Sequence, residues 1–249
     1  MIFVPHGAPF LAVDAELGAP LAAWGKALPR PAAILAVSAH WEDAPLTLGA
    51  TETRDLVYDF WGFPDELYRV RYAAPGAPAL ADRVVALLEG HEVRRSQRGL
   101  DHGVWTPLVH LFPAADIPVL QLSMPRPASA TDLFAIGKAL APLREEGVLI
   151  LGSGNLVHNL RRVVWEGEAE PEPWATAFDA WIGDVLARRD WEALLDYAAR
   201  APDLGIAHPS EEHFRPILVA AGAGAAASVS FPFTGWEMGN ISRRSVQFG

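Results

Sequence analysis

The chain has no cysteine among its 249 residues. Disulfide bonds and thiolate chemistry are therefore excluded, and any metal site must be built from imidazole and carboxylate groups. Basic residues are also few: 20 Lys and Arg stand against 30 Asp and Glu, which gives a net charge of -10. Binding to nucleic acid or to an anionic membrane surface needs clustered basic residues. We therefore expect a small molecule as the partner, with no nucleic acid and no membrane.

Long hydrophobic runs are absent as well. No apolar stretch approaches the roughly 20 residues that cross a bilayer. The first residues, Met-Ile-Phe-Val-Pro-His, lack the basic start and apolar core of a signal peptide. These two absences predict a cytoplasmic protein. Hydrophobic residues still make up 51% of the chain, which is enough for a substantial buried core.

Asparagine occurs at only three positions, and two of them, Asn155 and Asn159, lie in one short stretch around His158. A chain that otherwise avoids asparagine is expected to need these side-chain amides. We expect them to form hydrogen bonds with a ligand or with the ring of His158.

Apolar runs of strand length alternate with segments of helical character along the chain. The expected strands cover 1–5, 32–38, 46–50, 117–122, 147–151, 226–231 and 242–248, the last with the alternation of an edge strand. The expected helices cover 16–26, 77–89, a short stretch ending at 111, 132–143, 174–188, 191–199 and 210–221, with a surface loop at 165–173. This alternation predicts an α/β fold with a central, largely parallel or mixed sheet flanked by helices, organised as a single catalytic domain over residues 1–249.

Five histidines stand in distinctive surroundings. His6, His40 and His158 each follow an apolar run of strand type, so they are expected at the edge of the sheet where active sites of open α/β folds lie. His102 lies in a polar loop, and His213 lies at the expected start of a helix. Together they predict a mononuclear metalloenzyme.

Each motif also has a purely structural interpretation. Gly and Pro beside His6 predict a tight turn by themselves. Asp101 could orient the ring of His102, or that histidine could simply cap a helix. The helix dipole alone favours Glu211 and Glu212 near an N-terminus, but it disfavours a protonated histidine there and tolerates a neutral metal ligand.

Another motif, Gly-Ser-Gly-Asn at 152–155, resembles a phosphate-binding turn. It lacks the lysine of a Walker loop and the spacing of a dinucleotide fingerprint, so nucleotide binding is disfavoured.

Taken in order, the motifs resemble those of the class III extradiol ring-cleavage dioxygenases of the LigB superfamily, in particular the branch of the DOPA 4,5-dioxygenase extradiol proteins. The resemblance covers nearly the whole chain. It rests on Pro-His-Gly-Ala-Pro, Ser-Ala-His-Trp, Tyr-Asp-Phe-Trp-Gly-Phe-Pro, Asp-His-Gly-Val-Trp, Ile-Pro-Val-Leu-Gln-Leu-Ser, Gly-Ser-Gly-Asn-Leu-Val-His-Asn, Glu-Glu-His-Phe-Arg-Pro and Glu-Met-Gly-Asn-Ile-Ser. It implies a LigB-like dioxygenase fold.

The resemblance also implies roles for single residues. His6 and His40 would be metal ligands, with His213 as the third. Glu212 is the alternative third ligand, because founding members of the superfamily use two histidines and a carboxylate. His158 would be the general base toward the bound catechol, or a fourth ligand in a zinc-loaded protein. His102 would be an acid/base histidine that faces substrate and oxygen.

The implied reaction is cleavage of a catechol ring by dioxygen to a semialdehyde acid. Dioxygen is a triplet that reacts slowly with a closed-shell catechol, so activity would need Fe(II) with open positions, although Zn(II) could occupy the site in purified protein. Two other functions stay open: a zinc-dependent hydrolase on the same histidines, and a non-enzymatic binding protein of the same fold. Retention of all five histidines counts against the second.

Substrate identity, the bond that is cleaved and the oligomeric state stay open at this point. A carboxylate on the substrate could be recognised by Arg71, Arg98 or Arg161, and nothing in the sequence selects among them.

Overall fold

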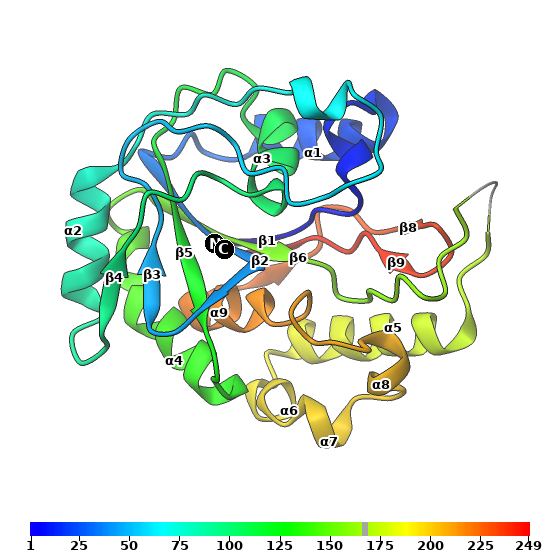
Figure 1. Ribbon diagram of the computed structural model, residues 1–249. Helices are drawn as coiled ribbons and strands as arrows, with labels where there is room; N and C mark the ends of the chain where they lie inside the picture. The colour runs from blue at the N-terminus through cyan, green and yellow to red at the C-terminus, as the bar shows by residue number, and fades with distance from the viewer. Residues whose placement is uncertain (166–168) are drawn as a thin grey trace.

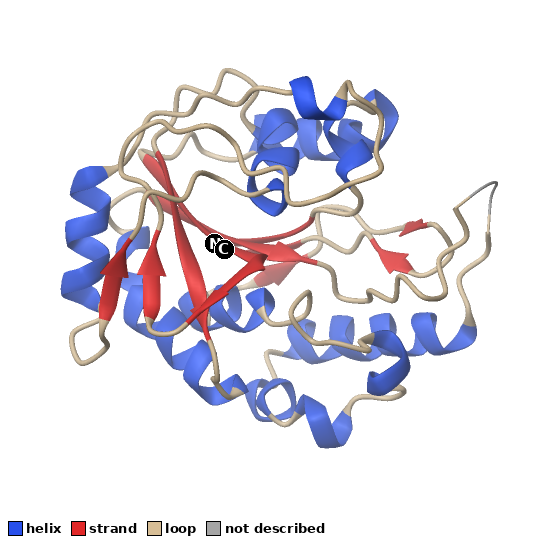
Figure 2. Cartoon of the chain, in the orientation of Figure 1, coloured by secondary structure: helices blue, strands red, loops and turns tan. Residues whose placement is uncertain are grey.

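The structure is a computed structural model that describes residues 1–165 and 169–249, so residues 166–168 of the loop expected at 165–173 lie outside the described residues. Its centre is a mixed sheet of eight strands with helices on both faces (Figures 1 and 2), as the α/β prediction required. The strands of this sheet, in spatial order, are β4 (Val93–Arg95), β3 (Leu46–Leu48), β5 (Val119–Pro125), β2 (Ala33–Asp43), β6 (Val148–Gly154), β1 (Ile2–Pro5), β10 (Val246–Phe248) and β7 (Val229–Ser230).

Four neighbouring strands in the middle of this sheet, β5, β2, β6 and β1, are parallel. Their carboxyl ends therefore meet at one edge of the sheet. The register pairs Ser38 of β2 with Ser153 of β6, and Pro5 of β1 with Gly154 of β6. The segments that follow these strands thus begin side by side.

Helices cover the two faces of the sheet as separate layers. On one face lie α1 (Ala15–Ala27) and α3 (His102–Leu111), above the sheet in Figure 1. The opposite face carries α4 (Ala130–Leu140), α9 (Pro216–Ala223) and the group α5 (Pro173–Arg188), α6 (Trp191–Leu195), α7 (Tyr197–Arg200) and α8 (Leu204–Ala207), whereas α2 (Pro78–Leu87) lies near the β4 edge. Short 3-10 turns lie at Pro9–Ala12, Leu67–Arg69 and Ala141–Arg144.

Both faces of the central strands are buried, which explains their continuous apolar runs. In β2, Ile34 and Ala36 belong to the core beneath α1 and α3, whereas Leu35 and Val37 belong to the core beneath α4 and α9. No helix in the described part of the chain is long and apolar enough to cross a membrane.

Several expected elements differ from those observed. The helix expected at 210–221 begins only at Pro216, because residues 210–215 form turns and a proline favours the first position of a helix. His102 is the first residue of α3 and not part of a loop. The expected edge strand at 242–248 is reduced to β10, which pairs with both β1 and β7, so β7 is the outer strand.

The remaining differences concern short helices and strands. The helix expected at 191–199 is divided into α6 and α7, and neither β4 nor α8 was expected. A small hairpin of β8 (Trp236–Glu237) and β9 (Ile241–Ser242) was also missed. These elements are five residues long or shorter, so they carry too few repeats of an apolar pattern to be recognised.

Candidate active site

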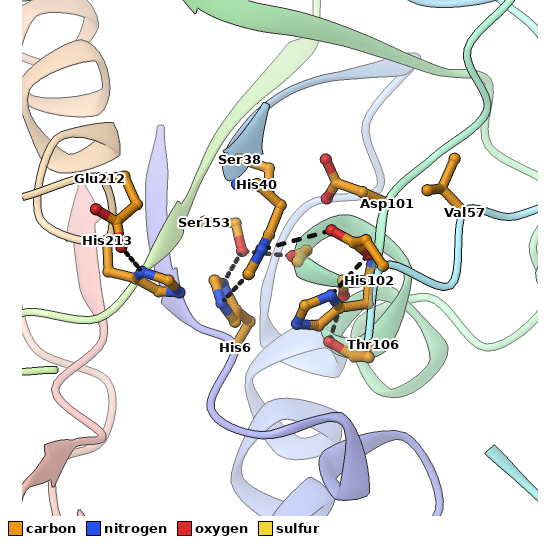
Figure 3. A network of polar contacts seen from close by, with 12 residues as sticks. His6, Ser38, His40, Val57, Asp101, His102, Thr106, Ser153, Glu212 and His213 are labelled. Atoms are coloured by element: carbon orange, nitrogen blue, oxygen red, sulfur yellow. Dashed lines mark hydrogen bonds and ion pairs between the residues drawn. The ribbon is translucent and has the colours of Figure 1, made fainter. Parts of the chain in front are cut away.

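The five histidines singled out in the sequence come together at the carboxyl edge of the parallel strands. His6 follows β1, His40 lies in the last part of β2, and His158 follows β6. His102 begins α3, and His213 lies in the turns before α9. Figure 3 shows the rings of His6, His40, His102 and His213 pointing toward one another from these separate elements.

Three of these rings form a nearly equilateral triangle. The ring centroids are 4.9 Å apart for His6 and His40, 5.0 Å for His40 and His213, and 5.2 Å for His6 and His213. The Nε2 atoms of His6 and His40 are 3.0 Å apart. Imidazoles that bind one ion at about 2.1 Å bring their centroids to roughly 5 Å from one another, and the triangle has this spacing. Potential ligand atoms within 4.8 Å of one another form two adjacent groups in the described part of the chain, His6 with His40 and His102, and His158 with Glu212 and His213.

Hydrogen bonds fix the ring of His6 in the tautomer that a metal ligand needs. Its Nδ1 lies 2.9 Å from the hydroxyl of Ser153, and that hydroxyl donates its proton to the carbonyl of Gly103. A hydroxyl has only one proton to donate, so Ser153 accepts the Nδ1–H of His6. The lone pair of His6 is therefore on Nε2, which faces His40.

Asp59 connects two of the histidines and was not among the predicted site residues. One carboxylate oxygen accepts hydrogen bonds from the backbone N–H and from Nδ1 of His102, at 3.2 and 2.8 Å. The other oxygen lies 3.5 Å from Nδ1 of His40. Burial would raise the pKa of Asp59, but the hydrogen bonds that His102 donates to it oppose this effect, and the pKa of Asp59 is lowered to about 2. Both rings therefore present Nε2 to the cavity.

His213 is oriented by its own neighbour in the sequence. Its Nδ1 lies 3.0 Å from a carboxylate oxygen of Glu212, which in turn accepts a hydrogen bond from Ser210 at 3.1 Å. On its other side His213 stacks against His158, with centroids 3.6 Å apart and an interplanar angle of 10°.

Burial keeps His6, His40, His158 and His213 neutral. Desolvation, reinforced by the neighbouring imidazoles, lowers the pKa of His6, His158 and His213 well below the usual histidine value. Desolvation is also the largest cause of the lowered pKa of His40, which falls to about 3. Neutral imidazoles keep the lone pairs that metal binding and proton acceptance require.

Four of the five histidines, His40, His102, His158 and His213, line an open pocket, and His6 is buried beside them. Apolar side chains form most of the remaining wall, in keeping with a site for a small organic ligand. The lining residues are Gly7, Ala8, Pro9, His40, Asp59, Phe60, Trp61, Phe63, His102, His158, Leu160, Trp165, His213, Met238 and Ile241.

Two expectations about hydrogen-bond partners were wrong. The side-chain amides of Asn155 and Asn159 donate to the carbonyls of Ser242 and Ile206, at 3.1 and 2.6 Å, and so hold backbone segments in place. Asp101 does not orient His102, because its hydrogen-bonded oxygen accepts from Gln121 at 2.5 Å. The aromatic run around Asp59 was noted in the sequence, but only tertiary structure brings that carboxylate to the histidines.

Comparison with known proteins gives one family. Residues 4–249 match the family described as the catalytic LigB subunit of aromatic ring-opening dioxygenase. The chain is 40% identical to a Beta vulgaris protein named 4,5-DOPA dioxygenase extradiol, over 99% of this chain and 95% of that protein. An Escherichia coli K12 protein of the same name is also 40% identical, over 100% and 94%.

The fold is also found in a crystal structure. An uncharacterized protein of Escherichia coli K12 is similar with a TM-score of 0.85 and 37% sequence identity. The likeness covers 100% of this chain and 98% of that protein.

Proposed function

Because the chain belongs to the LigB family of aromatic ring-opening dioxygenases and is an extradiol ring-cleavage enzyme, we propose that it opens a catechol ring with dioxygen at an Fe(II) ion held by His6, His40 and His213. The observation that carries this proposal is the triangle of neutral imidazoles with centroids 4.9–5.2 Å apart. Fe(II) bound there would supply the redox-active centre that the reaction between a catechol and dioxygen requires.

Glu212 serves this site as the residue that orients His213. Its carboxylate is engaged with Nδ1 of that ring at 3.0 Å. Carboxylates that hold the second nitrogen of a metal-binding histidine fix its tautomer and raise its basicity. His213 is therefore preferred to Glu212 as the third ligand.

His158 is assigned as the general base. The ring of His158 stacks face to face on that of His213, with centroids 3.6 Å apart and an interplanar angle of 10°. Because His213 is the proposed third ligand, we prefer the role of base for His158 to that of a fourth ligand. A neutral His158 on the pocket wall can accept a catechol hydroxyl proton.

His102 is assigned an acid/base role beside the substrate. Its Nδ1–H is held by Asp59 at 2.8 Å, so Nε2 is the nitrogen that exchanges a proton with a bound ligand. The negative charge of Asp59 stabilises the imidazolium that forms when His102 accepts a proton. The apolar wall from Phe60 to Phe63 limits the access of water to these groups.

Names of the relatives make DOPA the first catechol to test, and the 4,5 bond the first candidate for cleavage. The partners are then a small catechol and dioxygen. We also propose a cytoplasmic location, which fractionation of cells that express the untagged protein would test.

Metal-stripped protein loaded anaerobically with Fe(II) provides the decisive test. Oxygen uptake and visible absorbance are measured together with each of four candidate substrates: DOPA, caffeate, protocatechuate and catechol. Zn(II)-loaded protein is the control. Stoichiometric uptake with a yellow ring-opened product, only in the Fe(II) protein, supports the proposal. Bound Fe(II) without uptake on any catechol overturns it, and ester or amide cleavage by the Zn(II) protein would then assign a hydrolase.

A further inference from the structure

Large hydrophobic side chains that remain exposed gather at the mouth of the pocket. Trp61 is 85% exposed, Trp165 60% and Leu160 55%, and all three line the same pocket as the histidines. Trp61 belongs to the aromatic loop before α2, whereas Leu160 and Trp165 belong to the segment that follows β6. Apolar surface concentrated in this way marks a surface that contacts a ligand or partner.

Charge along the described part of the pocket wall is of one sign. Asp59 is its formally charged side chain, and no lysine or arginine lines it among residues 1–165 and 169–249. A carboxylate on the substrate would therefore find no basic side chain along the described wall with which to pair.

None of the three arginines that the sequence offered for a substrate carboxylate lines the described pocket wall. Arg71 donates hydrogen bonds to the hydroxyl of Tyr58 at 2.8 Å and to the carbonyl of Val70 at 2.9 Å. Arg98 lies over the ring of Trp41, with its guanidinium carbon 5.3 Å from the ring centroid. Arg161 is exposed in the segment that follows Leu160, and it does not line the described pocket.

We propose that the preferred substrate is a catechol with an uncharged, apolar arm that leaves the pocket between Trp61 and the Leu160–Trp165 segment, and that a carboxylate-bearing arm is disfavoured. This inference rests on the proposed catechol cleavage. It ranks DOPA, which carries a carboxylate, below catechols with alkyl or neutral arms. Trp61 and Leu160 are then specificity-determining residues, which contact the arm and not the reacting ring.

Two catechols with arms of similar length test this preference: 4-propylcatechol and 3-(3,4-dihydroxyphenyl)propanoate, with unsubstituted catechol as the reference. Fe(II)-loaded protein should show a kcat/KM for 4-propylcatechol at least about 10-fold above that for the propanoate, within the range that pocket contacts to small groups provide. Equal values, or a preference for the propanoate, overturn the inference.

Variants at the mouth supply the second test. Trp61→Ala should lower kcat/KM for 4-propylcatechol about 10-fold more than it lowers that for catechol, and Leu160→Arg should raise the relative kcat/KM for the propanoate about 10-fold. Val85→Ala, at an exposed hydrophobic position in α2, is the matched control and should leave all three values within about twofold. Substrate ratios that do not change in the two mouth variants contradict the assignment.

Anaerobic binding separates this inference from the catalytic proposal. Tryptophan fluorescence is titrated with each catechol in the Fe(II) protein. Tighter binding of 4-propylcatechol without turnover would support the apolar arm and overturn the dioxygenase assignment. The inference is overturned if the two catechols bind equally and sedimentation shows a dimer that Trp61→Ala abolishes. The pocket mouth would then be a contact between copies of the chain.

Discussion

Glu212 lies 3.0 Å from Nδ1 of His213 through one carboxylate oxygen. Glu212→Gln keeps a side-chain oxygen that can accept this hydrogen bond, so we expect the variant to retain Fe(II) within about 10-fold of the original affinity, whereas Glu212→Ala should weaken it about 10- to 100-fold. Equilibrium metal titration measures both. Loss of the ion in Glu212→Gln, with full occupancy in His213→Ala, would make Glu212 the third ligand.

His158 should be dispensable for metal binding but not for turnover. In His158→Ala we expect kcat to fall about 10²- to 10⁴-fold, because general-base assistance is of this size. Metal content by atomic absorption should be unchanged. His40→Ala is the comparison, since it should lower metal occupancy itself. Turnover that is unchanged in His158→Ala would remove His158 from the mechanism.

Asp59 should affect both the metal and the chemistry, because its two oxygens face His40 and His102. Asp59→Ala is expected to weaken Fe(II) binding about 10- to 100-fold and, at saturating Fe(II), still to lower kcat with little change in KM. Asp59→Asn retains one acceptor oxygen and should recover part of the loss. Asp65→Asn, in the same loop but exposed, is the control and should be neutral.

His208 should make the metal-free protein sensitive to acid. Burial lowers its pKa from 6.5 to about 4, although its hydrogen bond to the carbonyl of Leu156 partly opposes this. Between these two pH values the unfolded chain binds a proton that the folded protein does not, so the free energy of unfolding falls as the pH falls through this window. The full effect is on the order of 3 kcal/mol.

Replacement of His208 by glutamine keeps an N–H donor and removes this titration. Urea unfolding of metal-free protein at pH 7.5 and at pH 5 should therefore show a smaller loss of stability on acidification in His208→Gln than in the unmodified chain. The other buried histidines contribute to both proteins alike. An equal loss in the two proteins would contradict the assignment.

The sequence predicted which histidines meet but not how their rings are held. His6, His40 and His158 could be brought together from the chain alone, because the ends of parallel strands share one edge of a sheet. Their metal-binding and acid/base roles stay predictions. Asp59 could not be recognised, since the contact between its loop and α3 depends on how distant segments pack.

Local signals explain two of the errors. Pro216 marked the true start of α9, but Ser210 and the two glutamates after it also resemble a helix start. Scarcity drew attention to Asn155 and Asn159, yet these amides hold the carbonyls of Ser242 and Ile206. The rarity of asparagine indicated correctly that these side chains form specific hydrogen bonds. Composition does not show which group accepts a hydrogen bond.

The position of β1 in the sheet affects when the histidine cluster of the candidate active site can form during synthesis of the chain. β1 lies between β6 and β10, which are both made much later, so β1 waits for its partners from residues 148–154 and 246–248. Closing such long loops is slow compared with forming local contacts. Among the three proposed ligands, His6 is therefore the first to be synthesised and among the last to be placed, and we expect the nascent chain to take up a metal only after β10 has been made.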